Sequence, residues 1–176
     1  GLLNKTISVQ AAKPPAPNIA RCFEEGLINS ELWSELPPKR WFEKELPEAI
    51  AAAHEHGVPF IASIGYCADE VRQLGPQAEA AGADAIEFTL HYVERDFASA
   101  VHVARTLRES VEIPIIAKLS PHFGDLGELA IQLEPYVDAF ACINSLGPAL
   151  RIDIERVKPL LASQWGFGWL SGEPIR

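Results

Sequence analysis

Four short apolar runs, rich in β-branched residues, alternate along the chain with longer amphipathic stretches. Nearly continuous apolar character is typical of strands that are buried on both faces of a parallel sheet. The runs begin about 25 to 29 residues apart, which is the length of one strand–helix unit with its turns. They cover residues 58–64, 84–90, 113–119 and 138–144. The pattern therefore predicts consecutive βα units in an α/β fold.

Between these predicted strands, apolar positions recur at helical spacing. The predicted helices cover residues 43–56, 69–81, 94–110 and 126–136. Gly57 and Gly82 follow two of them, at the place where a helix end favours a residue with positive φ. A further strand is predicted over residues 4–8, and another begins near Phe167.

Repeated βα units build either a closed barrel or a doubly wound open sheet, and two features favour the barrel. The chain has no glycine-rich dinucleotide-binding turn, and polar residues gather at its predicted strand ends. We expect a (β/α)8 TIM barrel that is incomplete here, because 176 residues are fewer than the roughly 250 of a whole barrel. The chain starts at Gly1 and contains no methionine. We therefore expect one domain over residues 1–176 that lacks its first and last βα elements.

Residues 10–21 contain Pro14, Pro15 and Pro17 and fit neither a helix nor a central strand. They predict a long ordered loop after the first strand. Loops of this length in compact domains are often functional.

Composition narrows the class of function. A net charge of −9 leaves no basic surface for nucleic acid, so a small-molecule substrate is expected. The three cysteines, Cys22, Cys67 and Cys142, are isolated, which favours a reduced cytoplasmic protein without a metal cluster. No apolar run reaches the roughly 18 residues of a membrane span.

In a βα barrel, the carboxyl ends of the strands meet at one rim, which carries the active site. Six polar residues lie at or near such predicted ends: Lys5, Ser63, Glu87, Thr89, Lys118 and Asn144. Lys118 ends a buried run and is expected to project into the barrel mouth. Three interpretations are open: a lysine that reaches solvent or pairs with Glu87, a Schiff-base nucleophile, or a charge that stabilises an anionic flavin or enolate.

Amide and hydroxyl groups follow the last predicted strand of the repeat. Asn144 and Ser145 are suited to a planar, amide-bearing ligand, although Asn144 is also interpretable as a turn former. Asn29 is equally interpretable as a helix cap, and Glu87 as a structural partner of a lysine. Three histidines have no partner at metal-ligand spacing: His54, His56 and His102.

Several segments together resemble the dihydroorotate dehydrogenase and dihydropyrimidine dehydrogenase group of FMN-dependent barrels. In chain order they are Asn4–Ser8, Asn29–Glu35, Gly82–Thr89, Ile113–Pro121, Ile143–Gly147 and Gly168–Gly172. Each segment is a weak match alone, but their order and βα spacing make the combination fairly specific. The resemblance covers nearly the whole chain.

This resemblance implies hydride transfer between a pyrimidine carbon and flavin N5, while a side-chain base removes the neighbouring proton. The implied FMN-binding residues are Lys5, Thr6, Lys118, Gly168, Ser171 and Gly172. The implied substrate-binding residues are Asn29, Thr89, Asn144 and Ser145. Lys118 is also expected to stabilise the reduced, anionic flavin.

The chain departs from this group just after Glu87. The group has a Glu-Leu-Asn strand end followed by a cysteine or serine base, whereas Thr89 replaces the asparagine here and His91 or Tyr92 falls at the base position. A histidine with a pKa of about 6.5 is a better base at neutral pH than a tyrosine at about 10. His91 and Lys118 are therefore the predicted catalytic residues. Trp169 stands where the group has glycine and would crowd a flavin ring placed there.

The leading hypothesis is an FMN-dependent dehydrogenase acting on a CH–CH bond of a pyrimidine-like substrate. One alternative is a Schiff-base aldolase or lyase that uses Lys118. Another is a catalytically silent relative acting as a binding subunit. We expect a homo-oligomer, and an iron–sulfur electron-transfer partner on a separate chain because this one has no cluster motif.

Overall fold

The computed structural model describes residues 1–175, apart from the side chains of Phe23 and Pro174, and divides into two compact units. The parallel-sheet unit consists of Gly1–Ala11 and Trp33–Ile143. The antiparallel-sheet unit consists of Ala12–Leu32 and Asn144–Arg176. A single FMN-binding domain over residues 1–176 stays a prediction.

The parallel-sheet unit contains five parallel strands in the order β1-β4-β5-β6-β7. Their bounds are β1 Leu2–Leu3, β4 Phe60–Ile64, β5 Ala85–Thr89, β6 Ile115–Lys118 and β7 Ala139–Ala141. Apart from β1, these are the strands that the apolar runs predict, each with narrower bounds. The sequential order is that of consecutive βα units, so the predicted repeat is confirmed.

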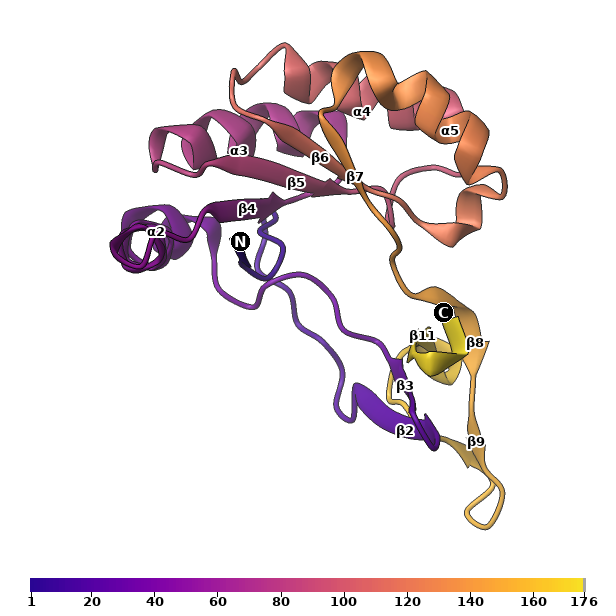
Figure 1. Cartoon of the computed structure of the whole chain (residues 1–176). Coiled ribbons are helices and arrows are strands. Elements are labelled where there is room, and N and C mark those ends of the chain that lie inside the picture. Colours follow the sequence, from indigo (N-terminus) through magenta and orange to yellow (C-terminus); the bar gives the residue numbers. More distant parts are fainter. Residues whose placement is uncertain (176) are drawn as a thin grey trace. The chain divides into compact units, whose positions relative to one another are not determined.

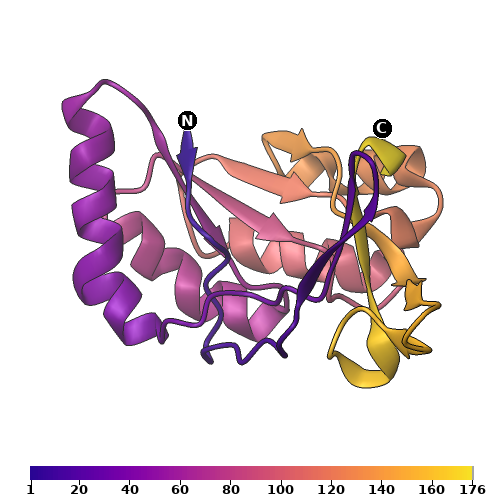
Figure 2. The same cartoon turned by 90° about the horizontal axis from the view of Figure 1, so that it is seen from below.

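Helices follow the strands at the predicted places. Their bounds are α1 Pro38–Arg40, α2 Leu46–Glu55, α3 Ala68–Ala80, α4 Phe97–Arg108 and α5 Leu126–Leu133, with 3-10 turns at Pro121–Phe123 and Glu134–Tyr136. A π-helical turn, Trp41–Glu45, joins α1 to α2, and the three pieces form one continuous helix in Figure 2. Helices α3, α4 and α5 all cover the same face of the sheet (Figure 1). One-sided covering is what a barrel wall requires and a doubly wound sheet does not have.

Local sequence explains where these helices begin and end. Asp96 and Asp125 precede α4 and α5, and each carboxylate accepts a hydrogen bond from a backbone N–H in the first turn. Gly57 and Gly82 have φ values of 66° and 94°, as the sequence predicts for the residues that follow α2 and α3.

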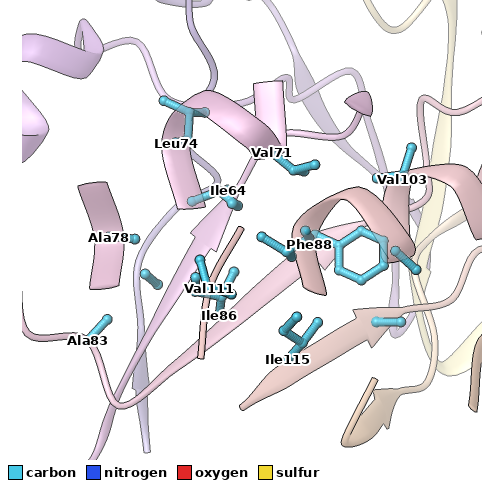
Figure 3. Packing of buried hydrophobic residues seen from close by; sticks show 14 of the residues in the cluster. Ile64, Val71, Leu74, Ala78, Ala83, Ile86, Phe88, Val103, Val111 and Ile115 are labelled. Carbon is cyan, nitrogen blue, oxygen red and sulfur yellow. The ribbon is translucent and has the colours of Figure 1, made fainter. Parts of the chain in front are cut away.

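The covered face of the sheet is apolar and buried. Ile86, Phe88 and Ile115 on the strands belong to one buried cluster with Val71 and Val103 on the helices, and Figure 3 shows Phe88 near Val103 and Ile86 beside Val111. In the strand register, Ile64 pairs with Phe88 and Phe88 with Ala117, so this apolar layer is continuous across the sheet. It is the main core of the unit.

The opposite face carries the polar positions. Ser63 pairs with Glu87, and Thr89 pairs with Lys118, so alternation along the strands places all four side chains on the face opposite Phe88. The apolar runs predict strands that are buried on both faces, and the structure differs from this prediction. One face packs against helices, while the other holds polar side chains toward its carboxyl edge.

The predicted strand over residues 4–8 is wrong in its bounds. Strand β1 ends at Leu3, and Ile7 returns to the sheet only as an isolated bridge to Ile64. Asn4 is the reason, because its side chain takes over backbone pairing. Its Oδ1 accepts from Ser63 N at 2.9 Å and its Nδ2 donates to Ser63 O at 3.1 Å.

The predicted strand over residues 138–144 is shorter and less buried than expected. Strand β7 has three residues, and Phe140 is 37% exposed. Within the described part of the chain, β7 pairs only with β6 and is an edge strand. Asn144 lies beyond it, in the other unit.

The antiparallel-sheet unit contains a four-stranded sheet in the order β2-β3-β11-β8 and a short hairpin of β9 and β10. The bounds are β2 Ile19–Phe23, β3 Gly26–Asn29, β8 Leu146–Leu150, β9 Ile152–Asp153, β10 Lys158–Pro159 and β11 Phe167–Gly172, with 3-10 turns at Gln164–Gly166 and Glu173–Ile175. Cys22, Ile28 and Leu161 form its small core.

This unit corrects two expectations. A strand does begin at Phe167, but it pairs antiparallel with β3 and β8 and does not extend the parallel sheet. The predicted loop over residues 10–21 ends early, because edge strand β2 begins at Ile19, after Pro17. None of the helices formed by residues 1–175 is both long enough and apolar enough to cross a membrane.

Candidate active site at the carboxyl edge of the parallel sheet

A row of hydrogen-bonding side chains crosses the polar face of the parallel sheet. The Thr6 and Ser63 hydroxyls lie 2.9 Å apart, and Ser63 Oγ donates to Glu87 Oε1 at 3.4 Å. Lys118 Nζ lies 3.9 Å from the same carboxylate oxygen. The row connects three neighbouring strands and the segment after β1, and it ends at Lys118, whose side chain is one-third exposed.

Glu87 is the buried acid of this row. Burial raises its pKa above the ordinary value, and the Lys118 charge and the Ser63 hydroxyl only partly oppose this shift. The interpretation of Lys118 as a partner of Glu87 therefore has a structural basis. At 3.9 Å the contact is an ion pair without a short hydrogen bond, which leaves donor capacity on Nζ.

His91 follows β5 and is buried, with 6% of its surface exposed. Its backbone N–H donates to Thr89 Oγ1 at 3.2 Å, and this hydrogen bond holds the backbone of His91 against the end of β5. Burial lowers the pKa of His91 to about 4, and the nearby His122 and Lys118 charges add to this effect. At neutral pH the imidazole is uncharged and can accept a proton.

A fully buried hydroxyl connects His91 to a second histidine. Ser120 Oγ lies 3.2 Å from His91 Nδ1 and 2.9 Å from His122 Nδ1. Ser120 and His122 follow β6, so the contact joins the ends of two neighbouring strands. Burial lowers the pKa of His122 as well, with a further contribution from the Arg95 charge.

Aromatic rings gather beside His91. Tyr92 contacts His91 at a centroid distance of 4.9 Å, Tyr66 at 5.1 Å and Trp33 at 5.6 Å. Tyr66 and Trp33 also contact each other at 5.7 Å. The cluster supplies a large, mostly apolar surface with polar tips, the kind of surface on which flat ligands pack.

The predicted site residues of the parallel-sheet unit divide by their surroundings. Thr6, Thr89, His91 and Lys118 belong to the polar row or border it. Lys5 instead forms a surface ion pair with Glu35 at 2.9 Å, which lowers the pKa of that carboxyl. The charge of Lys5 thus already has a carboxylate partner.

The remaining predicted residues lie in the antiparallel-sheet unit. Asn29 Nδ2 donates to Ser171 Oγ and to Trp169 O, both at 3.2 Å, so the structure brings Asn29 and Ser171 together. A Cβ at Gly168 would lie 2.4 Å from Leu161 and 2.5 Å from Asn29 O. Close packing inside the unit therefore explains why this position is glycine.

Gly172 is explained in the same way. It has a φ of 90°, and a Cβ there would lie 2.4 Å from Glu25 O. The Asn144 side chain accepts from Ser145 N at 2.8 Å and from Ser145 Oγ at 3.2 Å, which is the local bonding of a turn former. The predicted roles of these residues of the antiparallel-sheet unit in binding FMN or substrate stay predictions.

Ser120 and His122 are the site residues that the sequence interpretation missed. They directly follow the strand that ends at Lys118, so the rule that selects strand-end residues reaches them when it is extended by four positions. Across residues 1–175, no group of three His, Cys, Asp or Glu side chains has an arrangement that would hold a metal ion.

No protein-family model matches the chain. Its sequence is similar to catalytic subunits of dihydroorotate dehydrogenase B (NAD(+)) from several organisms. The Thermoplasma volcanium subunit is 32% identical over 139 residues, which are 73% of this chain and 45% of that protein. The Endomicrobium trichonymphae subunit is 27% identical over 191 residues, which span all of this chain and 58% of that protein.

The matched part is thus about half the length of these relatives, and shorter in other cases. The Methanothermobacter thermautotrophicus subunit is 39% identical over 75 residues, which are 42% of this chain and 24% of that protein. The resemblance seen in the sequence is confirmed as partial similarity to this group of oxidoreductases.

Solved structures with a similar fold are TIM-barrel proteins. Dihydrodipicolinate synthase from Bacillus clausii superposes with a TM-score of 0.52 at 23% identity, covering 62% of this chain and 37% of that protein. The synthase from Agrobacterium tumefaciens gives 0.52 at 22% identity, covering 74% and 46%. At these identities the likeness concerns the fold alone, and it confirms the predicted α/β class with its parallel sheet.

Proposed function

We propose that the chain is an FMN-dependent oxidoreductase of the dihydroorotate and dihydropyrimidine dehydrogenase type. The observation that carries the proposal is the polar row that ends at Lys118, with the neutral His91 near the same sheet edge. A cationic donor and a proton acceptor are the two groups that oxidation of a CH–CH bond next to a carbonyl requires. The partial similarity to dihydroorotate dehydrogenase subunits supports the same reaction class.

The residues of the parallel-sheet unit fit a flavin. Lys118, whose side chain is one-third exposed, offers a positive charge, Thr89 offers a hydroxyl group next to it in the strand register, and Thr6 offers one at the other end of the polar row. The glycines of β11 do not add to this fit, because contacts within their own unit account for them. Bound FMN would supply the hydride acceptor, its N5 atom.

The chain's own groups then have distinct tasks. Lys118 stabilises negative charge that develops at the reacting centre, and Glu87 holds the amine in place at the strand end. His91 removes the proton from the substrate carbon. The aromatic rings of Trp33, Tyr66 and Tyr92 exclude water from one side.

The low pKa of His91 bears on the substrate. A base is most effective when its pKa lies near the working pH, and a value of about 4 makes His91 a weak one. We therefore propose a substrate related to a pyrimidine or another cyclic amide, with weak or absent turnover of dihydroorotate and dihydrouracil themselves. Asn29, Thr89, Asn144 and Ser145 remain the proposed substrate contacts.

Further proposals concern the setting of the protein. We expect a homo-oligomer in the cytoplasm and electron transfer to a separate iron–sulfur protein. Cross-linking and analytical ultracentrifugation of the purified protein test the oligomeric state. Co-purification from its host tests the iron–sulfur partner. A monomer that reduces its final acceptor without a partner would contradict them.

One observation favours a second function, a Schiff-base aldolase or lyase. Lys118 Nζ lies 3.9 Å from Glu87, a buried carboxyl with a raised pKa. Glu87 also accepts a hydrogen bond from Ser63 Oγ. An amine next to a group that can donate and accept protons is the arrangement needed to form and hydrolyse an imine. The two functions make opposite demands, because Lys118 is a nucleophile in one and a fixed charge in the other.

The deciding experiment is the absorption spectrum of the purified full-length protein, before and after FMN is added. Flavin absorption that stays with the protein after gel filtration is expected. A colourless protein that takes up no FMN would overturn the leading proposal. Borohydride trapping of a carbonyl substrate on Lys118, absent in Lys118→Met and kept in the exposed control Lys39→Met, would then establish the second function. Failure of both assays would leave the binding-subunit hypothesis.

A further inference from the structure

Two histidines share one hydroxyl at the carboxyl edge of the parallel sheet. Ser120 Oγ lies 3.2 Å from His91 Nδ1 and 2.9 Å from His122 Nδ1, and Ser120 has no exposed surface. A serine hydroxyl has one proton to donate and lone pairs to accept with. It can donate to one imidazole while it accepts from the other, and this is the arrangement that links the two rings.

This constraint couples the tautomers of the two rings. If His91 carries its proton on Nδ1, Ser120 donates to His122 Nδ1, and the proton of His122 is on Nε2. If the hydroxyl turns round, the pattern reverses at both rings. A buried hydroxyl between two ring nitrogens thus transmits the protonation state of one histidine to the other.

The two histidines differ in their surroundings. His91 is the more deeply buried ring and packs edge to face against Tyr92 at 4.9 Å. His122 is half-buried and lies on Phe123 at 4.7 Å, and its Nε2 is a buried atom without a hydrogen-bond partner in the part of the chain that the structure describes. A positive charge is less costly on His122 than on His91, because His122 is the less buried residue of the two.

The surrounding charges act against a positive charge on each ring of the pair. Lys118 on β6 and the other histidine both act against a cation at His91, while Arg95 acts against one at His122. Burial lowers the pKa of both rings, and that of His91 to about 4. A proton that arrives at His91 is therefore better held elsewhere.

We propose that His91, Ser120 and His122 form a proton-transfer chain in which a proton taken up at His91 Nε2 ends as positive charge on His122. The bond between His91 Nδ1 and its proton breaks, and that proton binds Ser120 Oγ. The hydroxyl's own proton passes to His122 Nδ1. His91 ends as the neutral Nε2–H tautomer and His122 as an imidazolium, so protons and charge balance.

The role of this proton-transfer chain in turnover rests on the proposed function, in which His91 is the base. His122 is then a positioning residue that acts through Ser120. It removes the charge from the buried ring beside Lys118 and leaves His91 neutral.

The first test needs neither cofactor nor substrate. Nitrogen-15 NMR of histidine-labelled protein, assigned with His91→Gln and His122→Gln, reads the tautomer of each ring across a pH titration. We expect His91 to start as the Nδ1–H tautomer and to switch to Nε2–H at the pH where His122 becomes charged. In Ser120→Ala that switch at His91 is lost. Rings that titrate independently, or a switch that persists in Ser120→Ala, would overturn the proposal whatever the activity.

The second test separates proton transfer from simple support of the fold. In His122→Asn the amide oxygen keeps an acceptor for Ser120 but cannot bind the proton. We expect proton abstraction to slow on the order of 10- to 100-fold with an unchanged substrate Kd, and to slow little in the exposed control His102→Asn. Wild-type rates in His122→Asn would overturn the relay. Failure of the protein to bind FMN would overturn the proposed function alone, because the NMR titration still decides whether the relay exists.

Discussion

Asn4 replaces a stretch of backbone pairing with its own side chain, because its amide bonds to both the N–H and the C=O of Ser63. Asn4 is 9% exposed, so these hydrogen bonds are made away from water. They hold the segment after β1 against β4 and place Thr6 next to the Ser63 hydroxyl. The start of the polar row thus depends on one side-chain amide.

Replacement of Asn4 should therefore be costly. Asn4→Ala removes both hydrogen bonds and leaves the Ser63 N–H buried without that acceptor, so we expect the free energy of unfolding to fall by about 2–3 kcal/mol. Urea denaturation followed by circular dichroism measures the change. The matched control is Gln73→Ala on the exposed side of α3, which should stay within about 0.5 kcal/mol of the wild type. Equal losses in the two variants would show that the Asn4 contact contributes nothing specific.

Gly65 makes room for a buried carboxyl. A Cβ at this position would lie 1.9 Å from Glu70 Oε2, while Glu70 Oε1 accepts a hydrogen bond from Ser8 Oγ at 3.0 Å. Gly65→Ala should displace the carboxyl and destabilise the protein by about 1–3 kcal/mol. In a Glu70→Ala background the same change should cost much less, which a double-mutant cycle measures. Gly127→Ala in α5 is the control and should be neutral or slightly stabilising.

Glu70 should make stability depend on pH in an unusual direction. Burial raises its pKa above the ordinary 4.5, so above pH 4.5 the unfolded state loses this proton before the folded state does. The contribution of Glu70 is fully present below pH 4.5 and is lost as the pH rises through the folded-state pKa. Glu70→Gln does not titrate, so its stability relative to the wild type should increase with pH across this range. A difference that is constant with pH, or that shrinks as the pH rises, would contradict the burial argument.

Lys118→Ala should slow flavin reduction far more than it weakens substrate binding. The charge matters most when negative charge develops, and loss of such a donor costs about 100- to 1000-fold in rate. Stopped-flow absorption under anaerobic conditions separates the reduction rate from the substrate Kd. Lys39→Ala, a change at an exposed lysine, should leave both values unchanged. An unaffected reduction rate in Lys118→Ala would remove Lys118 from the mechanism.

The base is identified by comparing His91→Ala with Tyr92→Phe over a range of pH. His91 must be neutral to accept a proton and its pKa is lowered to about 4, so the rate should be flat toward neutrality and the acid limb of the wild-type profile should lie below the ordinary histidine pKa of about 6.5. His91→Ala should lose about 100- to 10,000-fold, whereas Tyr92→Phe should keep most of the activity. Rapid oxidation of dihydroorotate that survives both substitutions would show that neither residue is the base.

The sequence predicts the parallel-sheet unit well because its signals are local. Apolar runs and helical periodicity locate β4 to β7 and the helices after them, and Gly57 and Gly82 locate two helix ends. The polar face that carries Glu87 and Thr89 on β5, opposite Phe88, is not predicted, because the apolar runs are interpreted as strands buried on both faces. The strand at residues 4–8 fails because periodicity does not reveal that an asparagine side chain takes over the pairing of Ser63.

The antiparallel-sheet unit has no comparable local signal. Its strands are short, and β3 pairs with β11 far along the chain, so neither segment alone reveals the sheet. The sequence predicts ligand-binding roles for Asn29, Ser171 and the β11 glycines. The structure shows each of them in contacts within the unit. The Ser120 link between His91 and His122 is missed for the same reason, because it joins two strand ends across space.

The pairing of Asn29 with Trp169 also fixes an order of events on the ribosome. In the part of the chain that the structure describes, β5, β6 and β7 pair only with the parallel strands next to them in the sequence, so these described pairings can form once Ala141 has emerged. Strand β3 is synthesised earlier than any of these, yet it lacks its β11 neighbour until residues 167–172 appear. Throughout that interval its outer edge is an open template for another strand, the situation in which nascent chains associate wrongly. Strand β3, the second strand of the antiparallel sheet to be synthesised, thus gains its last described partner only near the end of this sequence.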